Sequence, residues 1–329
     1  MSTDKMSIVM PSVLGDIYTL INNAPLYFRY LPVKDIYIVG PSNIEQIVKD
    51  AHDDRLIFMN ENEFVDVPKI RALYAARCSV KLKRANWYVQ QFIKMQFARF
   101  TKDEYYLIWD SDTLPLKITP LFDKVSGKPI MRWEFWKKIS ICGYHDTHVN
   151  ILPGVNGDWG NASYVREHMV IKTAYMLELL DEIETNPKTK GSNFQEKIIN
   201  SVAVHNLPEI GFSEFQEYGG FVNWKYPDAY ILDNRWHSLR DPKRLCDNVA
   251  SFTDEEIRWL ASGYDAVSIE KWQIPTKISA LIHFRLFRAL FPPITLEILA
   301  KPRRLGKYML PKKYRNRVVS FIKRTLHLR

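Results

Sequence analysis

Two carboxylates, Asp110 and Asp112, stand one residue apart directly after the apolar run YYLIW at 105–109. The run predicts a buried strand, and Pro115 predicts that strand pairing stops shortly after the carboxylates. Mg²⁺ and Mn²⁺ prefer carboxylate oxygens, and Mg²⁺ keeps part of its coordination shell for water and substrate phosphates. The pair therefore predicts a metal site that holds a diphosphate. The alternative is structural, because aspartates at a strand end often form turns or cap helices.

The residues before this pair alternate between strand and helix patterns. Strand patterns cover 7–13, 35–40 and 56–59, whereas helical patterns cover 15–30, 42–51 and 87–100. Ser42 and Glu45 have the spacing of a capping box. The alternation predicts an α/β fold with a mostly parallel sheet flanked by helices, and such sheets bind ligands at the carboxyl ends of their strands. No GxGxxG or GxxxxGK[ST] motif occurs, so neither a dinucleotide site nor a P-loop is predicted.

Further elements follow the carboxylate pair. We predict a strand at 129–133, a polar, glycine-containing loop at 150–161 and a helix at 167–184. Ser192 and Gln195 predict the start of a helix that runs to about Val204, and Thr253 and Glu256 predict another helix start. The segment 212–220, FSEFQEYGG, is dense in acids and aromatics and predicts a turn.

Composition describes a folded protein in a reducing compartment. Aromatic residues make up 13% and apolar residues 46% of the 329 residues. The three cysteines, Cys78, Cys142 and Cys246, have no CxxC spacing and suggest neither a disulfide framework nor a zinc site. No long apolar run is present, so we expect a cytoplasmic protein without a membrane-spanning helix.

The net charge of +9 is unevenly distributed along the chain. Residues 276–329 carry 14 Lys and Arg against one acid, Glu297, which leaves 32 basic and 36 acidic residues in 1–275. The predicted organisation is therefore a catalytic domain at 1–275 and a basic tail at 276–329.

Segments 278–290 and 314–328 space apolar residues at helical intervals, which predicts amphipathic helices on an anionic membrane surface. Nucleic acid is not expected as a partner, because it would not need the apolar face; packing of that face on the domain is the alternative.

Several of these segments, in this order, resemble bacterial GT-A glycosyltransferases of the DUF6492 type, which act on surface polysaccharides. The resemblance covers about 7–240 and rests on Pro11, Ser12 and Asp16, on QQFIK at 90–94, on IWDSD at 108–112 and on SEFQEYG at 213–219. It implies a GT-A, Rossmann-like fold with a mixed, mostly parallel sheet. It also implies a nucleotide-sugar donor, a divalent metal (Mn²⁺ or Mg²⁺) and transfer of the sugar to a hydroxyl of a growing glycan.

The resemblance also implies roles for particular residues. Asp110 and Asp112 would bind the metal, with His237 as a further ligand assigned from chain order. The expected contacts to the nucleotide-sugar come from Pro11, Ser12, Asp16, Gln91, Lys94, Asp110, Ser111 and Asp112.

Sugar transfer needs a stabilised leaving diphosphate and an activated acceptor hydroxyl. The metal would act as a Lewis acid on the diphosphate, with Lys94 or Arg235 assisting. Glu217 or Glu214 would act as the catalytic base of an inverting enzyme.

Each of these residues has a structural alternative. Both glutamates suit a surface turn, His237 suits a structural imidazole, and Lys94 suits a solvated helix face. His145 and His148 flank Asp146, which resembles a metal cluster; an acceptor-side loop is the preferred interpretation.

We therefore expect a cytoplasmic glycosyltransferase, peripheral on the inner face of the cytoplasmic membrane. Its acceptor would be a glycan, or a lipid-linked glycan, in lipopolysaccharide, capsule or related polysaccharide assembly. The alternatives are a nucleotidyltransferase acting on sugar phosphates and a non-catalytic membrane-surface scaffold. A glycine-rich signature after the first strand would favour the nucleotidyltransferase, but only Gly15 is present there.

Overall fold

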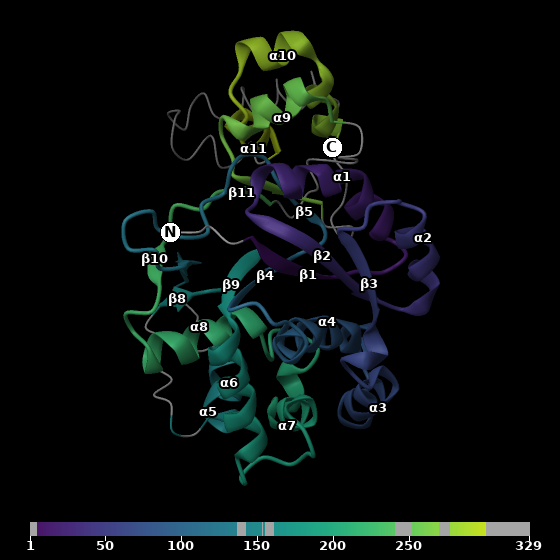
Figure 1. Cartoon of the computed structure of the whole chain (residues 1–329), viewed down its shortest axis with the longest axis vertical. Helices are drawn as coiled ribbons and strands as arrows, with labels where there is room; N and C mark the ends of the chain where they lie inside the picture. Colours follow the sequence, from purple (N-terminus) through teal and green to yellow (C-terminus); the bar gives the residue numbers. More distant parts are fainter. Residues whose placement is uncertain are drawn as a thin grey trace, which may run out of the picture. The chain divides into compact units, whose positions relative to one another are not determined.

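A computed structural model describes residues 5–136, 143–152, 154, 161–240, 252–269 and 277–300. The predicted tail helix at 314–328 lies outside the described residues. The chain divides into two compact units (Figure 1). Unit 1 comprises Met1–Ile21, Pro32–Ser111 and Pro120–Trp236, and unit 2 comprises Asn22–Leu31, Asp112–Thr119 and His237–Arg329.

Unit 1 is built on a five-stranded sheet in the order β3-β2-β1-β4-β9. The strands are β1 (Met6–Pro11), β2 (Val33–Gly40), β3 (Leu56–Asn60), β4 (Tyr105–Trp109) and β9 (His168–Lys172). The first four in this order run parallel, and β9 pairs antiparallel with β4. Every residue of β1 is buried, as expected for a strand covered on both faces. The predicted fold class, α/β with a mostly parallel sheet flanked by helices, is confirmed.

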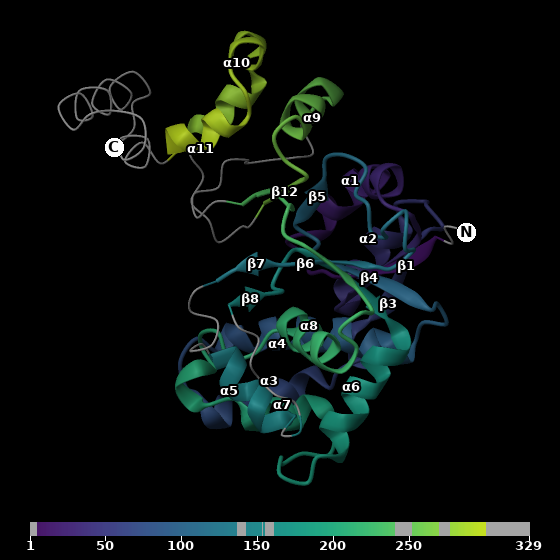
Figure 2. The same ribbon diagram turned by 90° about the vertical axis from the view of Figure 1, so that its left-hand side faces the viewer.

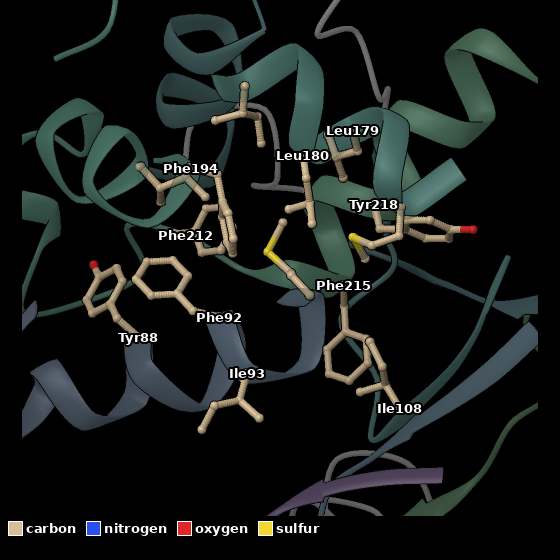
Figure 3. Close-up of a cluster of buried hydrophobic side chains, with 14 of the residues drawn as sticks. Tyr88, Phe92, Ile93, Ile108, Leu179, Leu180, Phe194, Phe212, Phe215 and Tyr218 are labelled. Carbon is tan, nitrogen blue, oxygen red and sulfur yellow. The ribbon is translucent and has the colours of Figure 1, made fainter. Parts of the chain in front are cut away.

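The helices of unit 1 gather mainly on one side of this sheet, where α3 to α8 lie together (Figures 1 and 2). Their side chains form one large apolar core with β4, in which the ring of Phe92 lies 5.8 Å from Phe194 and 6.0 Å from Phe212 (Figure 3). The helices are α2 (Glu45–Lys49), α3 (Val67–Arg77), α4 (Ala85–Gln96), α5 (Gly143–Ile151), α6 (Thr173–Thr185), α7 (Phe194–Ser201) and α8 (Glu214–Lys225); α1 (Ile17–Tyr30) continues from unit 1 into unit 2.

Two short strand pairs complete the sheets of unit 1. Strand β6 (Ile130–Arg132), which confirms the strand predicted at 129–133, pairs with β10 (Ile231–Asp233). Strand β7 (Glu134–Phe135) pairs with β8 (Ala162–Ser163). Short 3-10 turns occur at Ser42–Ile44, Glu61–Glu63, Leu82–Arg84, Phe97–Arg99 and Val204–Asn206.

Within the described residues, unit 2 contains a three-stranded sheet in the order β11-β12-β5 and, besides the end of α1, short helices near its C-terminal part. The strands are β5 (Thr113–Pro115), β11 (Ser238–Leu239) and β12 (Ala266–Ser268), and the helices are α9 (Asp254–Ala261), α10 (Arg285–Leu290) and α11 (Ile294–Ala300), with a 3-10 helix at Lys277–His283. The capping box of Thr253 and Glu256 at the start of α9 is confirmed. Pairing does not stop at Pro115 as predicted, because Pro115 pairs with Ala266 and the Leu116 amide donates to the Asp265 carbonyl at 2.9 Å.

Helices form at the predicted starts near Ser42 and Ser192, but the two predicted capping residues were wrong. Helix α2 has no side-chain cap, and Ser42 Oγ instead accepts a hydrogen bond from Asn60 Nδ2 at 2.6 Å. Asn193 rather than Ser192 caps α7, because its side chain accepts from the Glu196 amide at 3.0 Å. At α7 a neighbouring polar side chain thus caps the helix instead of the predicted one, whereas at α2 the predicted cap bonds to another side chain.

The helix predicted at 167–184 begins later, at Thr173, because the residues before it form β9. The run His168–Lys172 lies opposite β4, where Trp109 faces His168 and Ile108 faces Met169. Pairing with a buried neighbouring strand therefore decides the conformation of this apolar segment, which its own spacing leaves ambiguous.

The turn predicted at 212–220 is wrong, because α8 begins at Glu214 and runs through both glycines. A Cβ atom added to Gly219 would lie 2.5 Å from Cγ of Tyr164, so the helix packs against that ring where only glycine fits. Ser213 caps the helix, since its side chain accepts from the Gln216 amide. The glycine pair therefore marks close packing rather than a turn.

Candidate functional site

The first aspartate of the motif stands at the carboxyl end of β4. The Asp110 amide donates to the Glu167 carbonyl at 2.9 Å, which continues the pairing of β4 with β9. Its side chain is 30% exposed. Strand β1 runs parallel to β4, with Val9 opposite Ile108, so the residues that follow both strands lie at the same edge of the sheet. This is the edge at which open α/β sheets bind their ligands.

A buried lysine holds Asp110 in place. Lys94 of α4 donates to Oδ1 of Asp110 at 2.6 Å and to Oε1 of Glu214 at 2.8 Å, and its side chain is only 5% exposed. Burial opposes the charge on Lys94, but the two carboxylates and their hydrogen bonds outweigh it, so its pKa is raised. Lys94 therefore lies in a buried ion network, not on a solvated helix face.

The network holds two carboxylates around one ammonium group. Burial raises the pKa of Glu214, the charge of Lys94 opposes that rise, and the charge of Asp110 adds to it. Oδ1 of Asp110 accepts from Lys94, whereas Oδ2 has no hydrogen-bond partner among the described residues. One oxygen of Asp110 is thus fixed and the other is available to a ligand.

Gln91 connects the same two helices next to the network. Its Oε1 accepts from the Glu214 amide at 3.1 Å, and its Nε2 donates to the Trp87 carbonyl at 3.2 Å. The side chain is buried. Gln91 therefore orients the first turn of α8, from which Glu214 reaches Lys94.

The residues after β1 form the neighbouring part of the edge. Ser12 is buried, and its amide donates to the Val39 carbonyl at 2.9 Å. The Ser12 hydroxyl has no hydrogen-bond partner within the described ranges. Pro11 ends β1 and is buried, and the Asp16 amide donates to the Val13 carbonyl at 2.8 Å. Ser12 thus offers an unused hydroxyl at the carboxyl end of the sheet.

Glu217 lies deeper in the helical layer. Its Oε1 is 2.7 Å from Nδ1 of His148 on α5, and both side chains are buried. His148 is therefore engaged with Glu217, although the sequence had grouped it with His145 and Asp146. Arg235, a second expected assistant of the metal, pairs with Asp233 through Nε at 2.8 Å.

Sequence reasoning missed an aromatic cluster on the other side of Trp109. His168 stacks on Trp109 with ring centroids 4.8 Å apart and meets Trp236 edge-on at 4.3 Å. Nε1 of Trp236 donates to Oε2 of Glu167 at 2.9 Å. Burial, followed by the charges of Arg132 and Arg166, lowers the pKa of His168 well below its usual value. The clue in the sequence was a histidine inside the apolar run of β9.

The remaining site residues divide between the two units. Ser111 is the last residue of a unit 1 segment, whereas Asp112 and His237 belong to unit 2. Within unit 2 the Asp112 carbonyl accepts from the Ile269 amide at 2.8 Å. His237 is exposed; its amide donates to Oδ2 of Asp265 at 2.7 Å, and its carbonyl accepts from the Asp265 amide at 2.7 Å. In the part of the chain that the structure describes, no group of three or more His, Cys, Asp or Glu side chains is arranged to hold a metal ion.

The family follows from the sequence match. The model of DUF6492, described as a family of unknown function, matches residues 20–259, which is most of the chain. The chain belongs to the DUF6492 family. No curated protein matches the sequence of this DUF6492 member.

Solved structures with a similar fold are distant from this DUF6492 protein. The galactosyltransferase LgtC, in complex with donor and acceptor sugar analogues, is 11% identical, with a TM-score of 0.38 over 94% of this chain and 99% of LgtC. The glycosyltransferase GlyE of Streptococcus pneumoniae TIGR4 is 12% identical, with a TM-score of 0.39 over 91% of this chain and 65% of GlyE. A 4-diphosphocytidyl-2C-methyl-D-erythritol synthase of Anaerococcus prevotii is 10% identical, with a TM-score of 0.31 over 62% and 81%. These scores are too low to carry an argument about activity.

Proposed function

We propose that this DUF6492 protein is a metal-dependent glycosyltransferase that moves a sugar from a nucleotide-sugar donor to a hydroxyl of a glycan acceptor. The observation that carries the proposal is the state of Asp110. It stands at the carboxyl end of β4, where Lys94 holds one carboxylate oxygen and the other has no partner in the described structure. A structural aspartate at a strand end would use its oxygens for a cap or turn.

The donor end of the site is proposed at the carboxyl ends of β1 and β4. Asp110 and Asp112, which are separated by one residue, would bind Mn²⁺ or Mg²⁺. His237 would complete the coordination shell of the metal. Mg²⁺ is commonly held by one or two carboxylates plus substrate phosphates, so a larger cluster of protein ligands is not required. A bound ion would neutralise charge on the leaving diphosphate.

The same edge of the sheet offers further contacts to the nucleotide. The buried Ser12 hydroxyl, which has no partner in the described structure, would contact the donor, with Pro11 and Asp16 near it in the chain and Ser111 next to Asp110. Lys94 and Gln91 would act from beneath, because both are buried and already bonded to Asp110 or Glu214. Their contribution to donor binding would therefore pass through those two acids.

Of the two glutamates proposed as the catalytic base, Glu214 is the better supported. It shares Lys94 with Asp110, whereas Glu217 is paired with His148 in the buried layer. A carboxyl group with a raised pKa suits proton transfer near neutral pH. Replacing each acid in turn by glutamine separates them: Glu214→Gln should lower transfer more than Glu217→Gln, provided that both variants fold.

The wider setting is also part of the proposal. The acceptor would be a glycan or lipid-linked glycan of lipopolysaccharide, capsule or a related polysaccharide, and the basic tail would hold the enzyme on the inner face of the cytoplasmic membrane. The excess of Lys and Arg in 276–329 supports attraction to anionic lipid. No helix in the described ranges is long and apolar enough to cross a membrane.

Thermal-shift measurements with UDP- and GDP-sugars, with and without Mn²⁺, test the activity class. A glycosyltransferase should be stabilised by at least one donor only when the metal is present. The variant Asp112→Ala should fold normally and lose this stabilisation. A wild-type protein that no sugar nucleotide stabilises would support the membrane scaffold instead.

A further inference from the structure

Five large apolar side chains in residues 284–294 point into solvent. They are Phe284 (61% exposed), Leu286 (72%), Leu290 (64%), Phe291 (46%) and Ile294 (44%), and we call them the apolar ridge. Single exposed apolar residues are ordinary, but several in one short segment mark an interaction surface. The ridge comes from α10 and the turn into α11 (Figures 1 and 2).

The opposite side of α10 is fixed to α9. Arg288, only 8% exposed, reaches Glu255 at 3.0 Å and Glu256 at 3.4 Å. Nε1 of Trp259 donates to the Phe291 carbonyl at 2.9 Å, and the Trp259 ring lies 6.1 Å from that of Phe287. The side of α10 that carries the ion pairs therefore packs on α9, and Leu286 and Leu290, four residues apart on one helix face, remain outward.

The charge around the ridge is positive. Two acids of α9, Glu255 and Glu256, pair with Arg288, and Glu256 also accepts from His283 at 3.0 Å; Asp254, 69% exposed, lies 3.6 Å from Arg29. The single acid of 277–300, Glu297, accepts a hydrogen bond from the Tyr264 hydroxyl at 2.9 Å. Arg285 is exposed beside the ridge, and residues 301–329 add 11 Lys and Arg with no acid.

We propose that the apolar ridge inserts into the interface of an anionic lipid bilayer. This inference rests on the proposed membrane attachment and names the residues of the tail (276–329) whose apolar side chains would enter the bilayer. Aromatic and aliphatic side chains in a segment with an excess of Lys and Arg fit the boundary between acyl chains and anionic headgroups. A protein partner would have to match the same apolar side chains and also supply acids for the excess of Lys and Arg in 276–329.

Sedimentation of the full-length protein with vesicles tests the proposal. The vesicles contain phosphatidylcholine with or without phosphatidylglycerol, and the variant is Leu286→Ser with Leu290→Ser, which changes no charge. We expect it to bind the anionic vesicles at least ten-fold more weakly than wild type, because two apolar side chains no longer enter the interface. The matched control is Ile118→Ser with Val125→Ser, two residues 77% and 94% exposed outside the ridge, and it should bind as wild type does.

A second full-length variant separates the contribution of the apolar ridge to vesicle binding from that of the basic residues at 315–324. Replacing Arg315, Arg317, Lys323 and Arg324 by Glu should remove the salt-sensitive part of binding, whereas the ridge variant should lose the part that persists at high salt. Wild-type binding by the ridge variant would overturn the proposal, as would a wild-type protein that binds no anionic vesicle. If the ridge variant changed the oligomeric state in solution but not vesicle binding, the ridge would be the contact to a second copy of the chain. This result would also overturn the membrane proposal. Donor stabilisation by sugar nucleotides should be unchanged in the ridge variant, so failure of the glycosyltransferase proposal is recorded separately.

Discussion

At the scale of single residues, Lys94 decides how Asp110 is presented. An ammonium group buried between two carboxylates keeps its charge because both partners are within hydrogen-bond distance. Oδ1 of Asp110 is therefore fixed, and only Oδ2 is left for a ligand. This is a more specific role than the phosphate contact expected from the sequence.

Removing Lys94 should destabilise the fold. Lys94→Met leaves Glu214 buried without its cation, which costs about 3–5 kcal/mol for a broken buried pair. Adding Glu214→Gln should recover part of that loss, since no uncompensated buried charge then remains. Urea unfolding measures both, and a single variant as stable as wild type would show that the network contributes nothing.

His168 predicts how stability depends on pH. Its folded-state pKa lies well below 6.5, so the unfolded chain takes up a proton that the folded chain does not. Stability from this residue is full above pH 6.5 and falls as the pH drops below it, by about 1.4 kcal/mol per pH unit. His168→Phe should flatten the profile between pH 7 and 5, measured by urea unfolding at each pH. Equal slopes for wild type and His168→Phe would contradict this account.

Residue types and spacing were enough to place Asp110 at the end of a buried strand, because two carboxylates after an apolar run are visible in the sequence. The burial of Lys94 and the contact of His168 with Trp236 were not predictable in this way. Both depend on segments far apart in the chain that meet only in the folded core. A lysine on a helix has the same local pattern whether it faces solvent or a carboxylate.

At the scale of elements, α8 depends on a glycine that lets it approach Tyr164. Gly219→Ala gains about 1 kcal/mol in helix propensity but places Cβ 2.5 Å from Cγ and 2.8 Å from Cβ of Tyr164. Overpacking costs about 1–3 kcal/mol and should win, because Tyr164 Cβ cannot move without its backbone. We expect a net loss of up to about 2 kcal/mol in the free energy of unfolding, measured by thermal or urea unfolding.

The control for Gly219 is Gly154→Ala. An added Cβ atom there meets nothing within 4 Å, so stability should change by less than about 0.5 kcal/mol. A Gly219 variant as stable as this control would show that Tyr164 moves aside freely.

The parallel strands were predictable from sequence, whereas β9 and α8 were not. Strands β1, β2 and β4 are short apolar runs between polar segments, which is a strong local signal. The start of β9 follows from pairing with β4, and the two glycines of α8 follow from packing on Tyr164, so neither could be derived from local spacing.

At the scale of the whole molecule, two features carry the proposals: the carboxylates Asp110 and Asp112 that follow β4, and the apolar ridge of residues 284–294. The two parts make independent predictions, since vesicle binding does not need a donor and donor binding does not need a vesicle. Metal binding by Asp110 and Asp112 is the central proposal, because every proposed catalytic contact is arranged around these two carboxylates.

Hydrolysis of a panel of UDP- and GDP-sugars, followed with and without Mn²⁺, tests that claim most directly. Wild-type protein should release sugar from at least one donor. The rate of release should fall at least about 100-fold when the metal is chelated, and equally in the variants Asp110→Asn and Asp112→Ala. In each case the charge on the leaving diphosphate is no longer neutralised by the metal. Retention of the full rate by both folded variants would contradict the account.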